Sequence, residues 1–261
     1  MPVLDVKGRA IAYREQGKKR PSLLLVHGAG CSSLTFIELL HMIGRNQHVV
    51  ALDLPGHGKS AAFDFPIAPE DLLLRHRDVV ADFAEKLGLG CFVLAGHSMG
   101  GAIAQHFALE YADRLEGLIL MATAARLLVA KAVFSAIEQD FDQFPQMLSK
   151  VAYSPASAPS QVSRWAAEQI QAPKEVVMAD FRACACFDLR TEVSGITTPT
   201  TIFSGADDLL TPPKLQKRLM ELIPNSRLEI LSRAGHFLFR ERPDEVADLL
   251  INPIRQNGQR S

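Results

Sequence analysis

The chain has 261 residues, 48% of them hydrophobic, and its 28 Lys and Arg nearly balance its 29 Asp and Glu, which leaves a formal charge of −1. This balance argues against a protein that binds nucleic acid through its phosphates, and against an acid-rich disordered chain. The length suits a single α/β domain that buries a large core without disulfide or metal support.

The first residues lack the apolar block of a signal peptide, and no apolar run approaches the ~20 residues that a membrane span needs. The four cysteines are spread without a disulfide-scaffold or zinc-site pattern. We therefore expect a cytoplasmic protein with reduced thiols, with neither a membrane nor a nucleic acid as partner.

Short apolar runs alternate with longer amphipathic segments along the chain. A hairpin is predicted first, from Val3–Val6 and Ala10–Tyr13. The later runs predict strands at Leu23–Val26, Val49–Leu52, Phe92–Ala95, Leu115–Met121, Thr200–Ser204 and Leu228–Leu231. Because these runs are apolar, we expect strands that are covered on both faces, in a mostly parallel sheet with helices on both sides.

Helix signals fall between these strands. An apolar stripe from Leu72 to Leu87 predicts a helix that begins near Pro69, and Pro243 begins another near the C-terminus. Thr211 precedes two prolines, so we expect it to cap the helix that follows.

Residues 122–199 carry no convincing strand signal but many aromatic and aliphatic side chains. We predict an α/β core formed by residues 1–121 and 200–261, with residues 122–199 inserted as a helical cap. Such a cap would form an apolar pocket of modest size, with aromatic residues such as Phe144 or Trp165 against the substrate. The alternative is a set of ordinary helices packed beside the sheet.

The strongest chemical signal is the motif Gly96-His97-Ser98-Met99-Gly100, which lies between a predicted strand and a predicted helix. A sharp strand-to-helix turn exposes the serine and places it at the N-terminus of the helix, where backbone N–H groups face developing negative charge. Ser98 is therefore our candidate nucleophile.

A serine nucleophile needs a base, and the base needs an acid that orients it. His236 is the only histidine downstream of Ser98 that lies outside the helix following Ser98, and His106 within that helix is interpreted as structural. Asp207 and Asp208 follow a predicted strand, at a sheet edge where functional loops gather. Either aspartate fits the order serine, acid, histidine at this point.

The segment His27-Gly28-Ala29-Gly30 follows the first buried strand and can aim a backbone N–H at an oxyanion. We expect Ala29 to supply one such donor and Met99 the second. A dinucleotide loop is excluded because position 33 is serine, and a phosphate loop at Gly58 is excluded because position 53 is aspartate.

Three further histidines precede glycine or serine in predicted turns, without the spacing of a metal site, and are interpreted as structural; these are His27, His57 and His97. We therefore expect neither a metal nor an organic cofactor.

Together these motifs resemble the α/β-hydrolase fold family, in the family's own order from residue 27 to residue 236. The resemblance implies a nucleophile elbow at Ser98, an eight-stranded sheet, a cap after the sixth strand and the catalytic triad Ser98–Asp208–His236. The family's spacing places the acid at Asp208 and leaves Asp207 as its neighbour. The final third of the chain is similar to small serine esterases and lactone hydrolases of this family.

The function that follows from this reading is that of a serine hydrolase. It would cleave a carboxylic ester, thioester or lactone of a small apolar molecule through an acyl-enzyme. Alternatives on the same triad are a C–C bond hydrolase or an acyltransferase. A further alternative is a receptor-like protein that binds a ligand in the same pocket with little turnover.

Overall fold

The computed structural model describes residues 1–63 and 67–257. In this part of the chain eight strands form one sheet, in the order β1-β2-β4-β3-β5-β6-β7-β8. They are β1 (Val3–Val6), β2 (Arg9–Gln16), β3 (Ser22–Val26), β4 (Val49–Leu52), β5 (Phe92–His97), β6 (Leu115–Met121), β7 (Thr200–Gly205) and β8 (Ser226–Leu231). β2 is antiparallel to β1 and to β4, whereas all other neighbouring strands are parallel. The predicted α/β class with a mostly parallel, eight-stranded sheet is confirmed.

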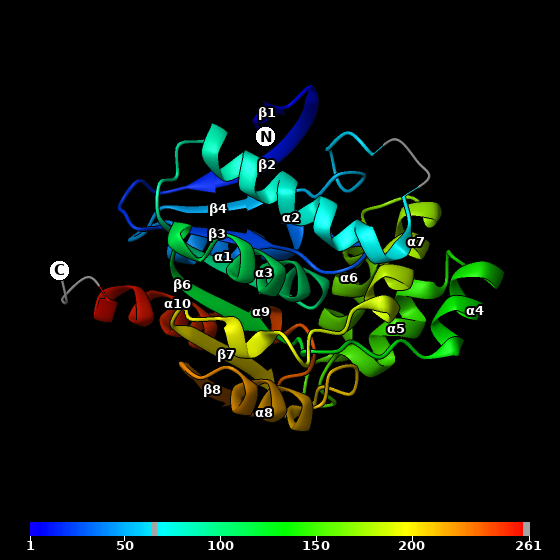
Figure 1. Ribbon diagram of the computed structural model, residues 1–261. Helices are drawn as coiled ribbons and strands as arrows, with labels where there is room; N and C mark the ends of the chain where they lie inside the picture. Colours follow the sequence, from blue (N-terminus) through cyan, green and yellow to red (C-terminus); the bar gives the residue numbers. More distant parts are fainter. Residues whose placement is uncertain (64–66, 258–261) are drawn as a thin grey trace.

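Helices cover both faces of this sheet, and successive strand residues point to opposite layers. Leu24 and Val26 pack into one apolar cluster with α2 and α3, whereas Leu23 and Leu25 pack into a second with α1 and α10. The helices outside the insertion are α1 (Ile37–Ile43), α2 (Pro69–Lys86), α3 (Met99–Glu110), α8 (Pro213–Leu222), α9 (Leu238–Glu241) and α10 (Pro243–Asn257). Figure 1 shows these helices around the sheet.

The expected coverage on both faces fails in two strands: at the start of β6, where Glu116 is exposed, and in β8. The last predicted strand, Leu228–Leu231, was expected to be covered on both faces, but in β8 Arg227 and Ile230 are exposed. β8 is the last strand of the sheet, at the margin of the helical layers, and its sequence mixes charged with apolar residues. Of its apolar residues, Leu231 is buried, Leu228 is partly covered and Ile230 is exposed.

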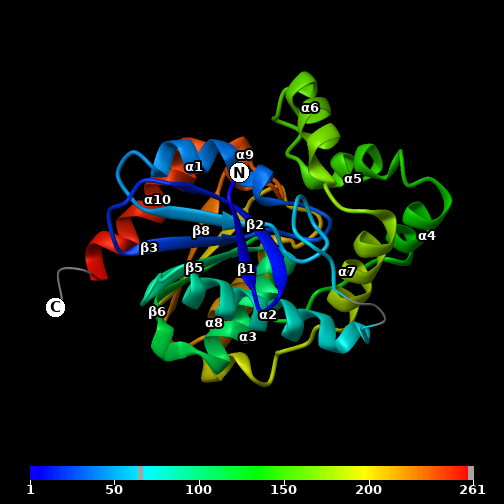
Figure 2. The same ribbon diagram turned by 90° about the horizontal axis from the view of Figure 1, so that it is seen from above.

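Four α-helices lie between β6 and β7, followed by a 3-10 turn at Val193–Gly195: α4 (Lys131–Gln139), α5 (Phe144–Ala152), α6 (Pro159–Gln169) and α7 (Lys174–Cys186). Residues 122–199 contain no strand, only one isolated bridge between Arg126 and Asp188. Figures 1 and 2, at right angles to each other, both show these helices gathered at one end of the sheet. We call residues 122–199 the inserted segment. The predicted core ranges also include residues 64–66 and 258–261, which lie outside the described residues.

None of the helices in the described ranges has the length and apolar character needed to cross a membrane.

Candidate active site

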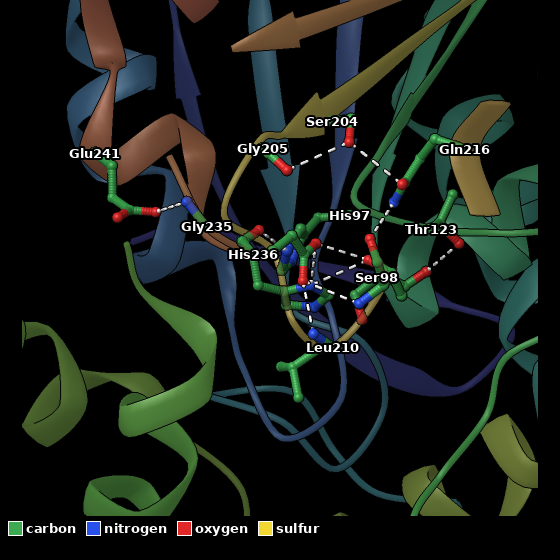
Figure 3. Close-up of polar contacts among 12 residues, drawn as sticks. His97, Ser98, Thr123, Ser204, Gly205, Leu210, Gln216, Gly235, His236 and Glu241 are labelled. Atoms are coloured by element: carbon green, nitrogen blue, oxygen red, sulfur yellow. Dashed lines mark hydrogen bonds and ion pairs between the residues drawn. The ribbon is translucent and has the colours of Figure 1, made fainter. Parts of the chain in front are cut away.

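Ser98 lies in the turn between β5 and α3, in a backbone conformation that a serine rarely adopts. Its φ of 54° and ψ of −116° fall in the strained region with positive φ. The neighbouring chain holds this turn, because Ser98 N–H donates to Met121 O at 2.9 Å and Thr123 Oγ1 donates to Ser98 O at 2.9 Å. Figure 3 shows the Thr123 contact. The end of β6 therefore fixes the serine on both sides of its Cα.

The glycines of the motif are explained by close backbone packing. A Cβ at position 96 would clash with the carbonyl of Gly100, and a Cβ at position 100 would clash with the carbonyls of Val26 and His27. No side chain fits at either place, so the sharp turn at Ser98 requires glycine there.

Asp208 lies at the end of the loop after β7, buried and fully hydrogen-bonded. Its Oδ1 accepts from Leu210 N at 2.8 Å and from Thr211 N at 2.9 Å. Its Oδ2 accepts from Thr211 Oγ1 at 2.7 Å and lies 2.9 Å from His236 Nδ1. Asp207 instead accepts from Ser154 Oγ at 2.5 Å. Of the two aspartates considered from the sequence, only Asp208 contacts His236.

The Asp208 contact sets the chemistry of the His236 ring. A carboxylate accepts hydrogen bonds, so Nδ1 carries the proton and Nε2 keeps a lone pair that can accept one. The His236 backbone is held at both ends, because its N–H donates to Ala152 O at 2.7 Å and its carbonyl accepts from His97 Nε2 at 3.0 Å. Figure 3 shows His236 beside Ser98 and His97. The side-chain hydrogen bonds of the described residues do not include one from Ser98 Oγ, and such contacts often form only with substrate bound.

Ala29 and Met99 are the predicted oxyanion donors. Met99 is the first residue of α3, so its N–H has no carbonyl one turn earlier within the helix to bond. Ala29 lines the same pocket as Ser98, in the loop after β3. A Cβ on the preceding Gly28 would lie 3.2 Å from Ser98 Cβ, which shows how closely this loop approaches the serine.

The neighbouring histidines support the loops of the site. Burial lowers the pKa of His97 and of His27 well below the usual value, so both are neutral. His27 Nε2 accepts from Leu54 N at 3.0 Å. His106 is partly buried on α3, where it contacts Phe187, and burial lowers its pKa to about 4. These three positions fit the predicted structural roles.

His57 differs from these histidines because it forms a buried ion pair with the inserted segment. Its Nε2 lies 2.7 Å from Asp180 Oδ2, on α7, and its Nδ1 lies 3.0 Å from Pro55 O. Burial opposes a charge on His57, but Asp180 outweighs burial and the pKa of His57 is raised. The same Asp180 oxygen accepts from Gly30 N at 2.8 Å. Asp180 thus ties α7 to the loop that carries Ala29.

A second buried carboxylate, that of Glu241, holds the loop of His236. It accepts from Gly235 N at 2.6 Å and from both Ser154 N and Ser157 Oγ at 2.7 Å. Figure 3 shows its contact with Gly235. Sequence reasoning missed Asp180, Glu241 and Thr123, because no local motif marks their distant partners.

One pocket of about 180 Å³ is lined by Ser98, His236 and Ala29, whereas Asp208 and Met99 are not among its lining residues. Its lining is Gly28, Ala29, Cys31, His97, Ser98, Leu127, Leu128, Val129, Ala130, Val133, Leu148, Gln169, Phe181, Cys184, Leu209, Leu210, Thr211, His236 and Phe237. The sheet loops supply Ser98, His236 and Ala29, whereas the inserted segment supplies most of the apolar side chains. No Lys, Arg, Asp or Glu is among these lining residues.

Two sequence predictions fail at the site. Thr211 does not cap α8, whose N-cap is Pro212, because the Thr211 hydroxyl donates to Asp208 instead. Phe144 and Trp165 are buried but do not line the pocket. They pack behind it, Phe144 against Phe181 and Trp165 against Tyr153, because the inserted helices bury their largest rings against one another.

Within the described residues, no group of three or more His, Cys, Asp or Glu side chains is placed to hold a metal ion. The groups that the site offers are a hydroxyl and an imidazole with its carboxylate, beside the predicted N–H donors of Ala29 and Met99. This set can form and break an acyl bond to oxygen without further groups.

Comparison with known proteins places these features in context. Residues 23–249 match the model of the Alpha/beta hydrolase family. The chain is 27% identical to a 2-hydroxy-6-oxo-6-phenylhexa-2,4-dienoate hydrolase of Comamonas testosteroni, covering 97% of this chain and 93% of the relative. It is 29% identical to a pimeloyl-[acyl-carrier protein] methyl ester esterase of Chromobacterium violaceum, covering 90% and 94%. A thermophilic esterase from Thermogutta terrifontis superimposes with a TM-score of 0.85 at 25% identity, covering 98% of this chain and 97% of that one.

Proposed function

The chain belongs to the alpha/beta hydrolase family of enzymes, and from this premise we propose that it hydrolyses a carboxylic ester through an acyl-enzyme on Ser98. The observation that carries the proposal is the contact of 2.9 Å between Asp208 Oδ2 and His236 Nδ1, because His236 and Ser98 line the same pocket. A serine, a histidine and an oriented carboxylate at one pocket are the groups that acyl transfer requires.

The proposed reaction has two halves. His236 Nε2 takes the proton of Ser98 Oγ as the oxygen attacks the ester carbonyl, and the N–H groups of Ala29 and Met99 stabilise the oxyanion. The His236 imidazolium then protonates the leaving alcohol as the C–O bond breaks. Water, activated by His236, releases the acid from Ser98. Throughout, Asp208 keeps Nδ1 protonated and stabilises the charged ring.

The pocket lining favours an uncharged substrate. No cationic side chain lines the pocket, so a substrate carboxylate would be buried without a partner, which is costly. The C–C bond hydrolase relative is named for a dienoate, a carboxylate substrate, whereas the esterase relative is named for a methyl ester. The lining therefore supports ester cleavage over C–C cleavage of a dienoate. A thioester or lactone needs the same groups as an ester.

We further propose that the inserted segment, residues 122–199, is a cap that selects the substrate. It supplies Leu127, Val133, Leu148 and Phe181 to the pocket of Ser98. The volume of about 180 Å³ is below the ~300–1,000 Å³ typical of sites for drug-sized ligands, so acyl groups of short or medium length fit best.

The test is a series of p-nitrophenyl esters from acetate to decanoate, assayed with the wild type and with Ser98→Ala. We expect turnover of short and medium esters, and a loss of about 10⁴-fold or more in Ser98→Ala. Ser163→Ala, an exposed serine on α6, is the matched control and should keep wild-type rates.

Two results would contradict the proposal. If Ser98→Ala keeps wild-type rates, Ser98 is not the nucleophile. A wild type that binds esters in the pocket but turns none over would favour the receptor-like alternative.

A further inference from the structure

The polar groups of the pocket are unevenly distributed. His97, Ser98, Thr211 and His236 belong to the catalytic network or contact it. The rest of the lining is apolar, apart from two thiols and the carboxamide of Gln169. Gln169 ends α6 and is only 1% exposed, so its amide is enclosed by protein and pocket.

Gln169 is oriented by a side chain that is itself fixed. Tyr153 OH donates to Gln169 Oε1 at 3.4 Å. The Tyr153 ring lies between Trp165 and Phe237, with centroids 5.4 Å and 5.2 Å away and interplanar angles of 25° and 23°. Burial raises the pKa of Tyr153, so its hydroxyl stays protonated and can donate. The oxygen of the Gln169 amide is thus assigned to Tyr153.

The side-chain nitrogen of Gln169, Nε2, carries two N–H groups that can each donate a hydrogen bond. Among the hydrogen bonds of the described residues, none uses Gln169 Nε2 as a donor. Gln169 Nε2 is not among the fully buried unpartnered atoms of the described residues, so the pocket that Gln169 lines can reach it, and an acceptor oxygen of a ligand there would gain a hydrogen bond. The chain just beyond Gln169 is held firmly, because Gln171 N donates to Gly30 O at 2.7 Å. Gln169 therefore lines the pocket from a backbone that is held in place.

We propose that Gln169 is a specificity-determining residue, whose Nε2 binds a second acceptor oxygen of the substrate, apart from the ester group that Ser98 attacks. This inference rests on the proposed esterase function. The substrate class is a neutral ester whose acyl chain carries a ketone or ether oxygen.

Charge limits the class to neutral acceptors. Arg240 is buried but does not line this pocket; it donates to the carbonyls of Thr35 and Trp165 and also interacts with Tyr153. Its remaining ion pair is with Glu168, at 4.0 Å. A carboxylate beside Gln169 would therefore find an amide but no free cation, whereas a ketone or ether needs only the amide.

The experiment compares esters that differ by one acceptor atom. p-Nitrophenyl levulinate is the valerate ester with one methylene replaced by a ketone, and the methoxyacetate is the butyrate ester with one methylene replaced by an ether oxygen. For each pair, kcat/KM is measured with the wild type and with Gln169→Met, which keeps the length of the side chain but has no donor. The two esters of a pair differ in intrinsic reactivity, but this difference is the same for both proteins. It therefore drops out when the kcat/KM ratio of the variant is compared with that of the wild type.

We expect the ratio of kcat/KM, acceptor ester over plain ester, to fall about tenfold in Gln169→Met for at least one pair. Gln169→Glu, which has the same shape but no N–H donor when ionised, should lower the ratio too and covers the case of a poorly folded Met variant. Gln161→Met, at an exposed position of the same helix, should leave the ratio unchanged.

Equal ratios in the wild type and in both Gln169 variants, with all four esters turned over, would overturn the role of Gln169 alone. A wild type that hydrolyses none of the four esters would overturn the esterase proposal and this inference with it.

Discussion

The sheet and the inserted segment are built differently. Every residue of β3, β4, β5 and β7 is buried, and the loops at the ends of these strands carry Ser98 and Asp208 on short, fully bonded turns. The inserted segment is covered less completely: Leu128, in the chain before α4, and Met147, on α5, are 65% and 47% exposed. The sheet thus supplies fixed chemical groups, whereas the inserted segment supplies apolar lining around them.

Among the contacts that join the inserted segment to the loops of the sheet, two are made by buried carboxylates only a few residues from the proposed catalytic groups. Asp180 joins α7 to the loop of Ala29 through Gly30, and Glu241 joins the turn at Ser154 to the loop of His236 through Gly235. Both Asp180 and Glu241 are buried carboxylates that accept hydrogen bonds from backbone N–H groups. A change in the inserted segment can therefore reach the proposed catalytic loops through these contacts.

The largest expected effect is on the sheet side, at Asp208. Asp208→Asn should lower kcat by about 10³–10⁴-fold, because an amide can donate to Nδ1 and leave the proton on Nε2, where the ring cannot act as a base. Steady-state kinetics on the best ester of the series measures the loss. Asp207→Asn is the matched control and should cost far less, because Asp207 bonds Ser154 and not His236. A larger loss of kcat in Asp207→Asn than in Asp208→Asn would show that Asp207, and not Asp208, orients His236.

The next effect is at the joint between the two regions. Asp180→Asn leaves His57 buried without its carboxylate, which should cost about 3–5 kcal/mol in the free energy of unfolding. Because the folded pKa of His57 is raised above 6.5, the stabilisation from its charge is complete below that pH and is lost as the pH rises through the folded pKa. The difference between wild type and variant should therefore shrink from about pH 6 to about pH 9.

Urea denaturation at the two pH values measures this change. The control is Asp188→Asn, an exposed carboxylate of the inserted segment whose pKa Arg190 lowers to about 2. Its stabilisation is present above its unfolded pKa and is lost only at acid pH, so its small effect should be the same at both values. A pH-independent difference for Asp180→Asn would mean that His57 is uncharged in the folded protein.

A third, smaller effect is confined to the wall of the pocket. Phe181→Ala opens the lining beside Phe144, so longer acyl chains should gain on shorter ones by about tenfold in kcat/KM. Phe141→Ala is the control, because Phe141 also packs against Phe144 but does not line the pocket. Equal shifts in both variants would mean that packing within the inserted segment, and not the pocket wall, sets chain length.

The sheet could be predicted from the sequence better than the pocket lining of the inserted segment, because buried strands have a recognisable local pattern and the lining does not. Apolar runs such as Val49–Leu52 mark buried strands directly, and the glycines around Ser98 are required by local clashes. α1 and α9 are too short for a periodic pattern to stand out. The rings of Phe144 and Trp165 were visible as apolar, but which rings face the pocket depends on how four helices pack.

The supporting groups of the site were beyond sequence reasoning for a related reason. Asp180 and Gly30 are 150 residues apart, and Glu241 reaches Ser154 across 87. A lone carboxylate on a helix usually indicates a solvated face, and only the folded chain reveals that these two are enclosed. By contrast, Asp208 and His236 each follow a predicted strand, and their order after Ser98 gave a local signal.

The smallest expected effect is at the mouth of the pocket, where Leu209 lines the opening and is 67% exposed. Leu209→Ser should change the free energy of unfolding by no more than about 0.5 kcal/mol, since the side chain is mostly in water already. A long acyl chain that passes over Leu209 would lose some apolar contact, so KM for the longest esters should rise about twofold while short esters are unaffected. Met147→Ser, at an exposed apolar position on α5 outside the lining, should change neither. If Leu209→Ser leaves KM unchanged at every chain length, the acyl chain does not leave the pocket past Leu209, and the inserted segment encloses it entirely.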